Sequence, residues 1–487
     1  MPVRESPMAK FERLLEAGDN EGALLVANEV LRQSPGSFFA RLGRARALMR
    51  LRNFIDADTE CNLALQVSPK DDLARVVRAA LDARLGRTDD AVANLRLVAR
   101  GRSVHAQEAQ IDLLQTLHDA GRLDEMAEEA KAPGAWRNDP RARLHFARIL
   151  SRTDKEAAAA EMAAIFRTNY PWVLRRFSGF EAVGILDKLG RYRDAFDLAT
   201  EIHKATTAPL DLNEWLPPMD QQIALLTKGA GHFKPRAERV EGVAFIAAMP
   251  RSGTTLLEQM LDRHPAIGGI GEFDGIDHVC RSLWSTGSWP RVPGAVPNQV
   301  FADLQKFYLA GARHIRKPGA TWTFDKTLRG WRALAEIACV LPGSVCINVE
   351  RDPRDMATSI YLSYFNPTSY EWTAHFSAIR QIAEYQRRMV PLAFEVLGLA
   401  NERIVYEDLV EDPAHYASRC LSLMGLEMDE RVLRPEENTK TAATLSHAQV
   451  RQPINKKSIG RWKNYEWAFD ASWDKVVSEH ESRRKFR

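Results

Sequence analysis

The chain has 487 residues, of which 45% are hydrophobic and 27% charged, enough apolar material for two folded cores. Its formal net charge of +3 excludes a bulk electrostatic attraction to nucleic acid, so anion binding must come from local clusters. No apolar run reaches the roughly 18 residues that suggest a membrane helix, and the first residues lack the apolar centre of a signal peptide. Its five cysteines form no close metal spacing, and their odd number does not suggest a secreted disulfide set. We therefore expect a cytoplasmic protein that needs no metal.

A motif with a period of about 34 residues recurs through residues 1–210. The copies are separated by 34, 34, 35 and 69 residues and lie at 16–23, 50–57, 84–91, 119–126 and 188–195. A glycine between two helices and a small residue opening the second helix are typical of tetratricopeptide repeats. The pattern predicts an all-α tetratricopeptide solenoid over 1–210, followed by a connector over 211–240. Such a solenoid commonly binds a protein or peptide, although a purely supporting role stays open.

The most informative segment follows the connector. An apolar run over 243–249 predicts a buried parallel strand, and a short turn with Pro250 leads into an amphipathic helix. The turn and helix start contribute backbone N–H groups, hydroxyl donors and a guanidinium, from Arg251, Ser252, Gly253, Thr254 and Thr255. A strand, a tight turn and a helix N-terminus together predict a phosphate site.

This turn lacks the lysine of the usual nucleotide-triphosphate loop, G-x-x-x-x-G-K-[ST]. Its absence argues against ATP or GTP, although a P-loop kinase stays open as an alternative.

A second anion site is predicted a hundred residues further on. Residues 344–350 are typical of another buried strand, and Arg351 stands at its carboxyl end, where open α/β sheets bind ligands. Ser359 lies about two helical turns beyond Arg351. Two such anion sites after successive strands suggest a ligand with two separated phosphate groups.

The segments P-R-S-G-T-T-L and R-D-P-R-D-x-x-x-S together resemble the cofactor signatures of sulfotransferases, which use 3′-phosphoadenosine 5′-phosphosulfate (PAPS). The resemblance covers about residues 240–466 and is strongest to tyrosylprotein sulfotransferases and to bacterial sulfotransferases with tetratricopeptide repeats. It implies that residues 241–487 form an α/β, P-loop-like sulfotransferase domain with a parallel sheet. It also implies that Arg251 to Thr255 hold the 5′-phosphosulfate, and that Arg351 and Ser359 hold the 3′-phosphate.

The same resemblance assigns the chemistry. Glu272 corresponds to the family's catalytic base, and Lys326, with help from Arg251, corresponds to the cation on the bridging oxygen between phosphate and sulfate. A base must remove the acceptor proton, and a fixed cation stabilises the departing oxygen most in the transition state. The family's second acid is replaced by Phe273 here. Three histidines remain rival bases, namely His264, His278 and His314.

Further cofactor contacts are implied for Tyr406 and for a C-terminal loop that closes the site in the family. The loop residues concerned are Ser446, Arg451, Asn455, Lys457 and Arg461. One expected arginine is absent, since its position is occupied by Ser363.

The resemblance therefore implies a PAPS-dependent enzyme that transfers a sulfuryl group to an acceptor hydroxyl, with tyrosine in a protein or peptide as the first candidate. Sulfation of a carbohydrate or lipid hydroxyl, and a scaffold with an inactive sulfotransferase-like domain, stay open. PAPS is expected as co-substrate and no metal. The expected partner is an acceptor protein or peptide, with no nucleic acid and no membrane span, and a homodimer is left open.

Overall fold

The computed structural model describes residues 5–51, 53–229, 231–438 and 452–484. By its internal contacts the chain divides into two compact units, Met1–Glu161 and Met162–Arg487. The division falls within helix α10 (Lys155–Arg167). The predicted domain boundaries at 210 and 240 concern the sequence repeats and remain predictions.

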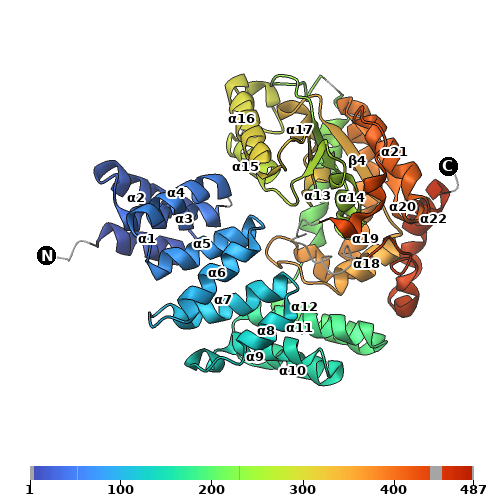
Figure 1. Cartoon of the computed structure of the whole chain (residues 1–487). Helices are drawn as coiled ribbons and strands as arrows, with labels where there is room; N and C mark the ends of the chain where they lie inside the picture. The colour runs from blue at the N-terminus through green and yellow to red at the C-terminus, as the bar shows by residue number, and fades with distance from the viewer. Residues whose placement is uncertain (1–4, 52, 230, 439–451, 485–487) are drawn as a thin grey trace. The chain divides into compact units, whose positions relative to one another are not determined.

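The first unit is helical. Its helices are α1 (Pro7–Glu16), α2 (Asn20–Gln33), α3 (Phe38–Arg50), α4 (Phe54–Val67), α5 (Asp72–Arg84), α6 (Thr88–Ala99), α7 (Ala106–Asp119), α8 (Leu123–Glu129) and α9 (Pro140–Leu150), with a 3₁₀ turn at Ala135–Asn138. Figure 1 shows these helices in blue to teal. The helical N-terminal region expected from the sequence is thus confirmed.

The repeated motif corresponds to one recurring turn between paired helices. The glycines of four copies have positive φ angles of +80°, +77°, +71° and +77°, at Gly18, Gly86, Gly121 and Gly190. Residues that carry a side chain rarely adopt this left-handed backbone conformation, which explains why glycine recurs there. The small residues that open the second helices are fully buried, at Ala23, Ala57 and Ala91. The local geometry follows the period seen in the sequence, while the tetratricopeptide assignment stays a prediction.

The second unit contains a five-stranded sheet with helices on both sides (Figure 1). Its strands are β1 (Val243–Ile246), β2 (Ile267–Gly269), β3 (Trp322–Asp325), β4 (Val345–Glu350) and β5 (Ala400–Val405). Its helices after α10 are α11 (Trp172–Lys188), α12 (Tyr192–Thr206), α13 (Leu212–Leu226), α14 (Thr254–Asp262), α15 (Gly275–Ser285), α16 (Asn298–Ile315), α17 (Leu334–Val340), α18 (Pro353–Tyr361), α19 (Phe376–Leu397), α20 (Tyr406–Glu411), α21 (Pro413–Leu423) and α22 (Asp474–Arg484). Short 3₁₀ segments lie at 293–295, 330–332, 371–374, 430–433, 435–437, 461–468 and 471–473.

All strand pairs of this sheet are parallel, in the order β2-β3-β1-β4-β5. In the centre, Phe245 pairs with Asp325 of β3 on one side and with Cys346 of β4 on the other. This confirms the predicted parallel sheet. Because every strand runs in the same direction, all five carboxyl ends lie at one edge.

Alternate residues of β1 pack against different layers, as the twofold periodicity of a strand requires. Ala244 and Ile246 belong to a buried cluster with Leu257 of α14 and Leu409 of α20. Phe245 faces the opposite layer, where its ring centroid lies 5.6 Å from that of Tyr308 on α16. The strand is therefore buried on both faces, which explains its unbroken apolar sequence.

Helices α11 and α12 pack against the end of α18 and the segment that follows it. The fully buried Arg176 donates to the Phe365 carbonyl (3.1 Å), and His203 Nε2 lies 2.9 Å from the Tyr361 carbonyl oxygen. Thr200 Oγ1 lies 2.9 Å from the Tyr361 hydroxyl. The last repeat-like helix pair is thus part of the second compact unit. No helix in the described part of the chain has the length and apolarity needed to span a membrane.

Candidate functional site

The residues predicted from separate motifs lie along one edge of the sheet. Glu272 follows β2, Lys326 follows β3, the 247–253 loop follows β1, Arg351 follows β4 and Tyr406 follows β5. Each of the five strands is thus followed, at its carboxyl end, by one predicted site residue or loop. This is the edge at which open parallel sheets bind ligands.

The loop after β1 has the strained backbone of an anion site. Gly253 caps α14 with a φ of +97°, and a Cβ built on it would lie 2.2 Å from Cδ2 of Tyr406. Arg251 is the non-glycine residue with a positive φ (67°) in the described chain. The loop therefore enters α14 tightly, with Thr254 and Thr255 buried in its first turn. Free N–H groups and the helix dipole at such an N-terminus favour a phosphate.

The two predicted anion sites meet through direct hydrogen bonds. Arg251 Nε donates to Ser359 Oγ on α18 (2.8 Å), and Arg351 Nη1 donates to the Arg251 carbonyl oxygen (2.9 Å). Ser359 in turn provides its carbonyl oxygen to the hydroxyl of Ser363 (2.6 Å). The serine at the position of the expected arginine thus braces the backbone of α18 rather than adding a charge.

Three guanidinium groups make this part of the site strongly cationic. Burial, together with the positive charges of Arg351 and Arg461, lowers the pKa of Arg251 to about 10. The Nε of Arg351 is buried and finds no hydrogen-bond partner among the described residues. Its guanidinium lies 4.7 Å from the ring centroid of Tyr406. Crowded like charges and an unsatisfied buried donor are relieved by a bound anion, so these residues fit a phosphate-bearing ligand.

The C-terminal segment is tied to the second anion site by backbone contacts. Arg351 Nη2 donates to the Ser458 carbonyl oxygen, and the amides of Gly460 and Trp462 donate to the Asp355 carboxylate (2.7 and 2.8 Å). Burial raises the pKa of Asp355 above its usual range. Arg461 forms an ion pair with Asp187 at the end of α11 (2.8 Å).

The other described residues predicted in this loop, Asn455 and Lys457, form hydrogen bonds within the loop itself. The side chain of Asn455 shapes its own turn, donating to the Pro453 carbonyl (2.9 Å) and accepting the amide of Lys457 (3.2 Å). The side chain of Lys457 is exposed. Ser446 and Arg451 lie outside the described residues.

The predicted base and the predicted cation form an ion pair. Lys326 Nζ lies 2.7 Å from Glu272 Oε1, and the lysine side chain is 1% exposed whereas that of Glu272 is 36% exposed. The Lys326 amide also donates to the Gly271 carbonyl oxygen (3.1 Å). Glu272 therefore reaches solvent from a pair whose other member is buried, which is where an incoming hydroxyl group could meet it.

The rival histidines have local roles. His264 Nδ1 accepts the amide of Ala266 (3.1 Å) in the turn after α14. His278 lies in α15, with its ring centroid 4.2 Å from that of Phe307, and His314 is exposed at the end of α16. Glu272, by contrast, contacts Lys326 (2.7 Å).

Several polar residues of the site were not singled out from the sequence. Asp325 is fully buried beside Lys326, accepting the Tyr308 hydroxyl (2.8 Å) and the Thr327 amide (2.9 Å). Burial raises the pKa of Asp325 to about 8. Asp325 belongs to the segment Thr323–Thr327, next to the predicted Lys326. Its hydrogen-bond partner, Tyr308 of α16, lies 17 residues upstream and is known only from the structure.

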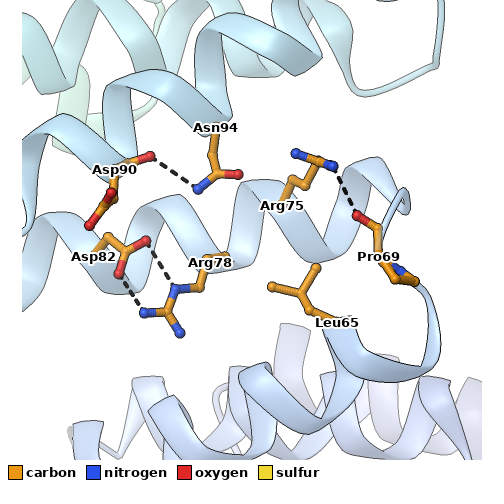
Figure 2. Close-up of a pocket in the computed structure, with 7 residues that line it drawn as sticks. All are labelled: Leu65, Pro69, Arg75, Arg78, Asp82, Asp90 and Asn94. Atoms are coloured by element: carbon orange, nitrogen blue, oxygen red, sulfur yellow. Dashed lines mark hydrogen bonds and ion pairs between the residues drawn. The ribbon is translucent and has the colours of Figure 1, made fainter.

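A separate surface cavity of about 300 Å³ lies in the first unit, between α4, α5 and α6 (Figure 2). Its lining is Leu65, Pro69, Arg75, Arg78, Asp82, Asp90 and Asn94. Its polar groups bond to one another: Arg78 pairs with Asp82 (2.8 Å), and Arg75 donates to the Pro69 carbonyl (2.9 Å). The sequence did not predict this cavity, and its internal pairing gives it no evident reactive group.

Among the described residues, no group of three or more His, Cys, Asp or Glu side chains is arranged to hold a metal ion.

Residues 244–430 match the model of the sulfotransferase family. An uncharacterized protein from Aquifex aeolicus (strain VF5) is 24% identical over 322 residues, covering 61% of this chain and 40% of that protein. Protein-tyrosine sulfotransferase 2 from Gallus gallus is 22% identical over 261 residues, covering 50% of this chain and 69% of that protein. Among solved structures, the sulfotransferase domain from the Synechococcus PCC 7002 olefin synthase is 18% identical, with a TM-score of 0.34, covering 48% of this chain and 97% of that domain. Residues 244–430 of this chain are therefore similar to the sulfotransferase family.

Proposed function

We propose that this protein transfers a sulfuryl group from PAPS to an acceptor hydroxyl. The observation that carries this proposal is the order of groups along the sheet edge. A base–cation pair, Glu272 and Lys326, lies at β2 and β3, and an arginine cluster built on Arg251 and Arg351 lies at β1 and β4. A donor with two phosphate groups and one reactive sulfate matches an edge with reactive groups at one end and cations at the other.

The anion-binding part of the edge would hold the cofactor. The N-terminus of α14, with Gly253, Thr254 and Thr255, suits the 5′-phosphate. Arg351, whose Nε lacks a partner among the described residues, suits the 3′-phosphate together with Ser359. PAPS, when bound, supplies the sulfuryl group and a phosphate leaving group.

The reactive part of the edge would then serve proton transfer and charge stabilisation. Glu272 accepts the proton of the acceptor hydroxyl as the acceptor oxygen forms its bond to sulfur. Lys326 stabilises the electron pair that stays on the bridging oxygen when the old sulfur–oxygen bond breaks. Arg251 adds a second positive charge near that oxygen. The proton ends on Glu272 and the sulfuryl group on the acceptor, so charge and atoms balance.

Tyrosine in a protein or peptide is the acceptor that we propose. The relative from Gallus gallus is named a protein-tyrosine sulfotransferase, and an N-terminal helical region of repeats would suit a protein substrate. The partly exposed Glu272 is compatible with a phenolic hydroxyl presented from a chain.

The first test is calorimetry of the whole protein with adenosine 3′,5′-bisphosphate, beside ATP with Mg²⁺. Binding of the bisphosphate, with Arg351→Ala weakening it, supports the cofactor assignment. Binding of ATP–Mg²⁺ alone contradicts it and supports a kinase-like protein. The second test supplies radiolabelled PAPS with tyrosine peptides, sugars and lipid alcohols as separate acceptors. Label in peptides that is lost on Tyr→Phe replacement supports the tyrosine assignment, and label only in sugars or lipids overturns it.

A further inference from the structure

Glu258 connects the phosphate-binding helix to the loop of the proposed base. It lies in the second turn of α14 and is 3% exposed. Its Oε1 accepts the amide of Gly271 at 2.7 Å, and Gly271 directly precedes Glu272. A hydrogen bond to a buried carboxylate is stronger than one between neutral groups, so this contact fixes the backbone next to Glu272.

The same glycine also contacts the loop of Lys326. The Gly271 carbonyl oxygen accepts the Lys326 amide at 3.1 Å, and Gly271 has a φ of +66°. One residue with a backbone favoured by glycine thus bonds to Glu258 through its N–H group and to Lys326 through its carbonyl group. The main chains next to both proposed reactive residues are therefore joined at a single point.

A second carboxylate on the same helix strengthens this connection. Asp262, one helical turn beyond Glu258, accepts the amide of Gly269 (2.7 Å). A Cβ built on Gly269 would lie 3.0 Å from Glu258 Oε1 and 3.4 Å from Asp262 Oδ1. The end of β2 therefore rests directly on two carboxylates of α14, without room for a side chain between them.

Simple packing does not account for Glu258. Its helix neighbours Leu257, Met260 and Leu261 fill the apolar core, and a buried carboxylate is costly without hydrogen bonds. The negative charge of Glu258 also contributes to the raised pKa of Asp325, so two acidic groups share this interior. The hydrogen bond that Glu258 accepts from the Gly271 amide offsets this cost, and it links the carboxylate to the turn of the proposed base.

We infer that Glu258 is a positioning residue, which holds the Gly271–Glu272 turn on the helix whose N-terminus forms the anion site. This inference rests on the proposed function, because it assigns Glu272 as the base. Since Gly253 caps α14 and Glu258 lies on it, the ligand phosphate and the base would be held by one rigid element. A base displaced by about 1 Å can lose about a hundredfold in rate.

The kinetic test compares Glu258→Ala with Glu258→Gln, which keeps a carbonyl oxygen at the same place. We expect Glu258→Ala to lower kcat about 10- to 100-fold, with the Kd for adenosine 3′,5′-bisphosphate changed less than about threefold. Glu258→Gln should recover most of the rate. Glu60→Ala removes a buried carboxylate of the first unit and should leave both values unchanged. A normal kcat in Glu258→Ala, or a Gln variant as slow as the Ala variant, would overturn the inference.

A second measurement needs no activity. Amide hydrogen exchange of the unliganded full chain should be about tenfold or more faster at Gly271 in Glu258→Ala than in the wild type, and near normal in Glu258→Gln. If the wild type transfers no sulfuryl group, the proposed function fails and the exchange result alone decides whether Glu258 holds this turn. If the wild type transfers sulfate but exchange at Gly271 is unaffected by Glu258→Ala, the proposed function stands and the positioning role fails.

Discussion

Lys326 and Glu272 form an ion pair in which the cation is buried and the carboxylate reaches solvent, with Nζ and Oε1 2.7 Å apart. A buried ammonium group is costly without its counter-ion, so each residue of the pair determines where the other one lies. Their motifs are 54 residues apart in the sequence, and the neighbouring strands β2 and β3 bring them together.

Removing the carboxylate should therefore abolish turnover without abolishing cofactor binding. For Glu272→Ala we expect kcat to fall by about two to four orders of magnitude, because the acceptor loses its base. Calorimetry with adenosine 3′,5′-bisphosphate should give a near-normal affinity. Adding Lys326→Met to this variant should cost less than it costs in the wild type, since residues acting as a unit are not additive. A near-normal rate in Glu272→Ala would remove this residue from the proposed mechanism.

Arg351 should matter mainly for binding. Its guanidinium contacts the Arg251 carbonyl and the Ser458 carbonyl and retains a buried Nε without a partner in the described chain. We expect Arg351→Ala to weaken binding of adenosine 3′,5′-bisphosphate by about 10-fold or more, the scale of a lost charge-assisted hydrogen bond. The matched control is Arg434→Ala, which removes an exposed arginine paired with Glu437. Equal affinities in the two variants would contradict the role of Arg351.

Gly253 should not tolerate even a methyl group. Its φ of +97° and the 2.2 Å approach of a Cβ to Tyr406 mean that Gly253→Ala strains the loop and displaces the ring. We expect a lower melting temperature and weaker binding of the bisphosphate. Gly184→Ala is the control: within α11, an added Cβ would meet no atom within 4 Å apart from the neighbouring backbone of its own helix, so this change should be neutral or stabilising. If Gly253→Ala binds normally, the tight loop is not the phosphate site.

His203 should make the second compact unit sensitive to acid. Burial, with a smaller contribution from the positive charge of Arg176, lowers the pKa of His203 from 6.5 to about 3. The unfolded chain therefore binds one more proton than the folded chain between these values. The contribution of His203 to the free energy of unfolding is therefore fully present above pH 6.5. It decreases by about 1.4 kcal/mol per pH unit as the pH falls toward 3.

The check is the melting temperature of the transition that the bisphosphate shifts, measured from pH 7.5 down to 4.5. His203→Gln should melt lower at neutral pH but lose less on acidification than the wild type. His415→Gln, on the surface of α21, should follow the wild type. A His203→Gln profile parallel to that of the wild type would refute the linkage.

The sequence predicted the parallel sheet well because its signals are local. The run of apolar residues before Arg251 and the similar run before Arg351 each indicate a buried parallel strand, and both strands are present. The turn at Gly253 can likewise be recognised from a few neighbouring residues.

The contacts that join these motifs were not predictable in the same way. Asp325 accepts a hydrogen bond from the Tyr308 hydroxyl, and the Gly271 amide donates one to Glu258. Each bond joins two elements whose packing against each other is not encoded in any local sequence pattern. The ion pair of Arg461 with Asp187 joins residues 274 positions apart. Such partners follow from the packing of the fold, and a single sequence carries no signal for them.

The docking of α11 and α12 on the segment after α18 bears on how this protein could be divided or recombined. A fragment beginning near residue 241 would leave the Tyr361 carbonyl and the Phe365 carbonyl without the donors that His203 and Arg176 provide. It would also release Arg461 from Asp187, next to the arginine cluster. We therefore expect a fragment starting near residue 162 to be soluble and to bind the bisphosphate, and one starting near 241 to aggregate. The last repeat-like helix pair would then fold with the sheet, so we expect helical regions to be exchangeable between relatives only upstream of α11.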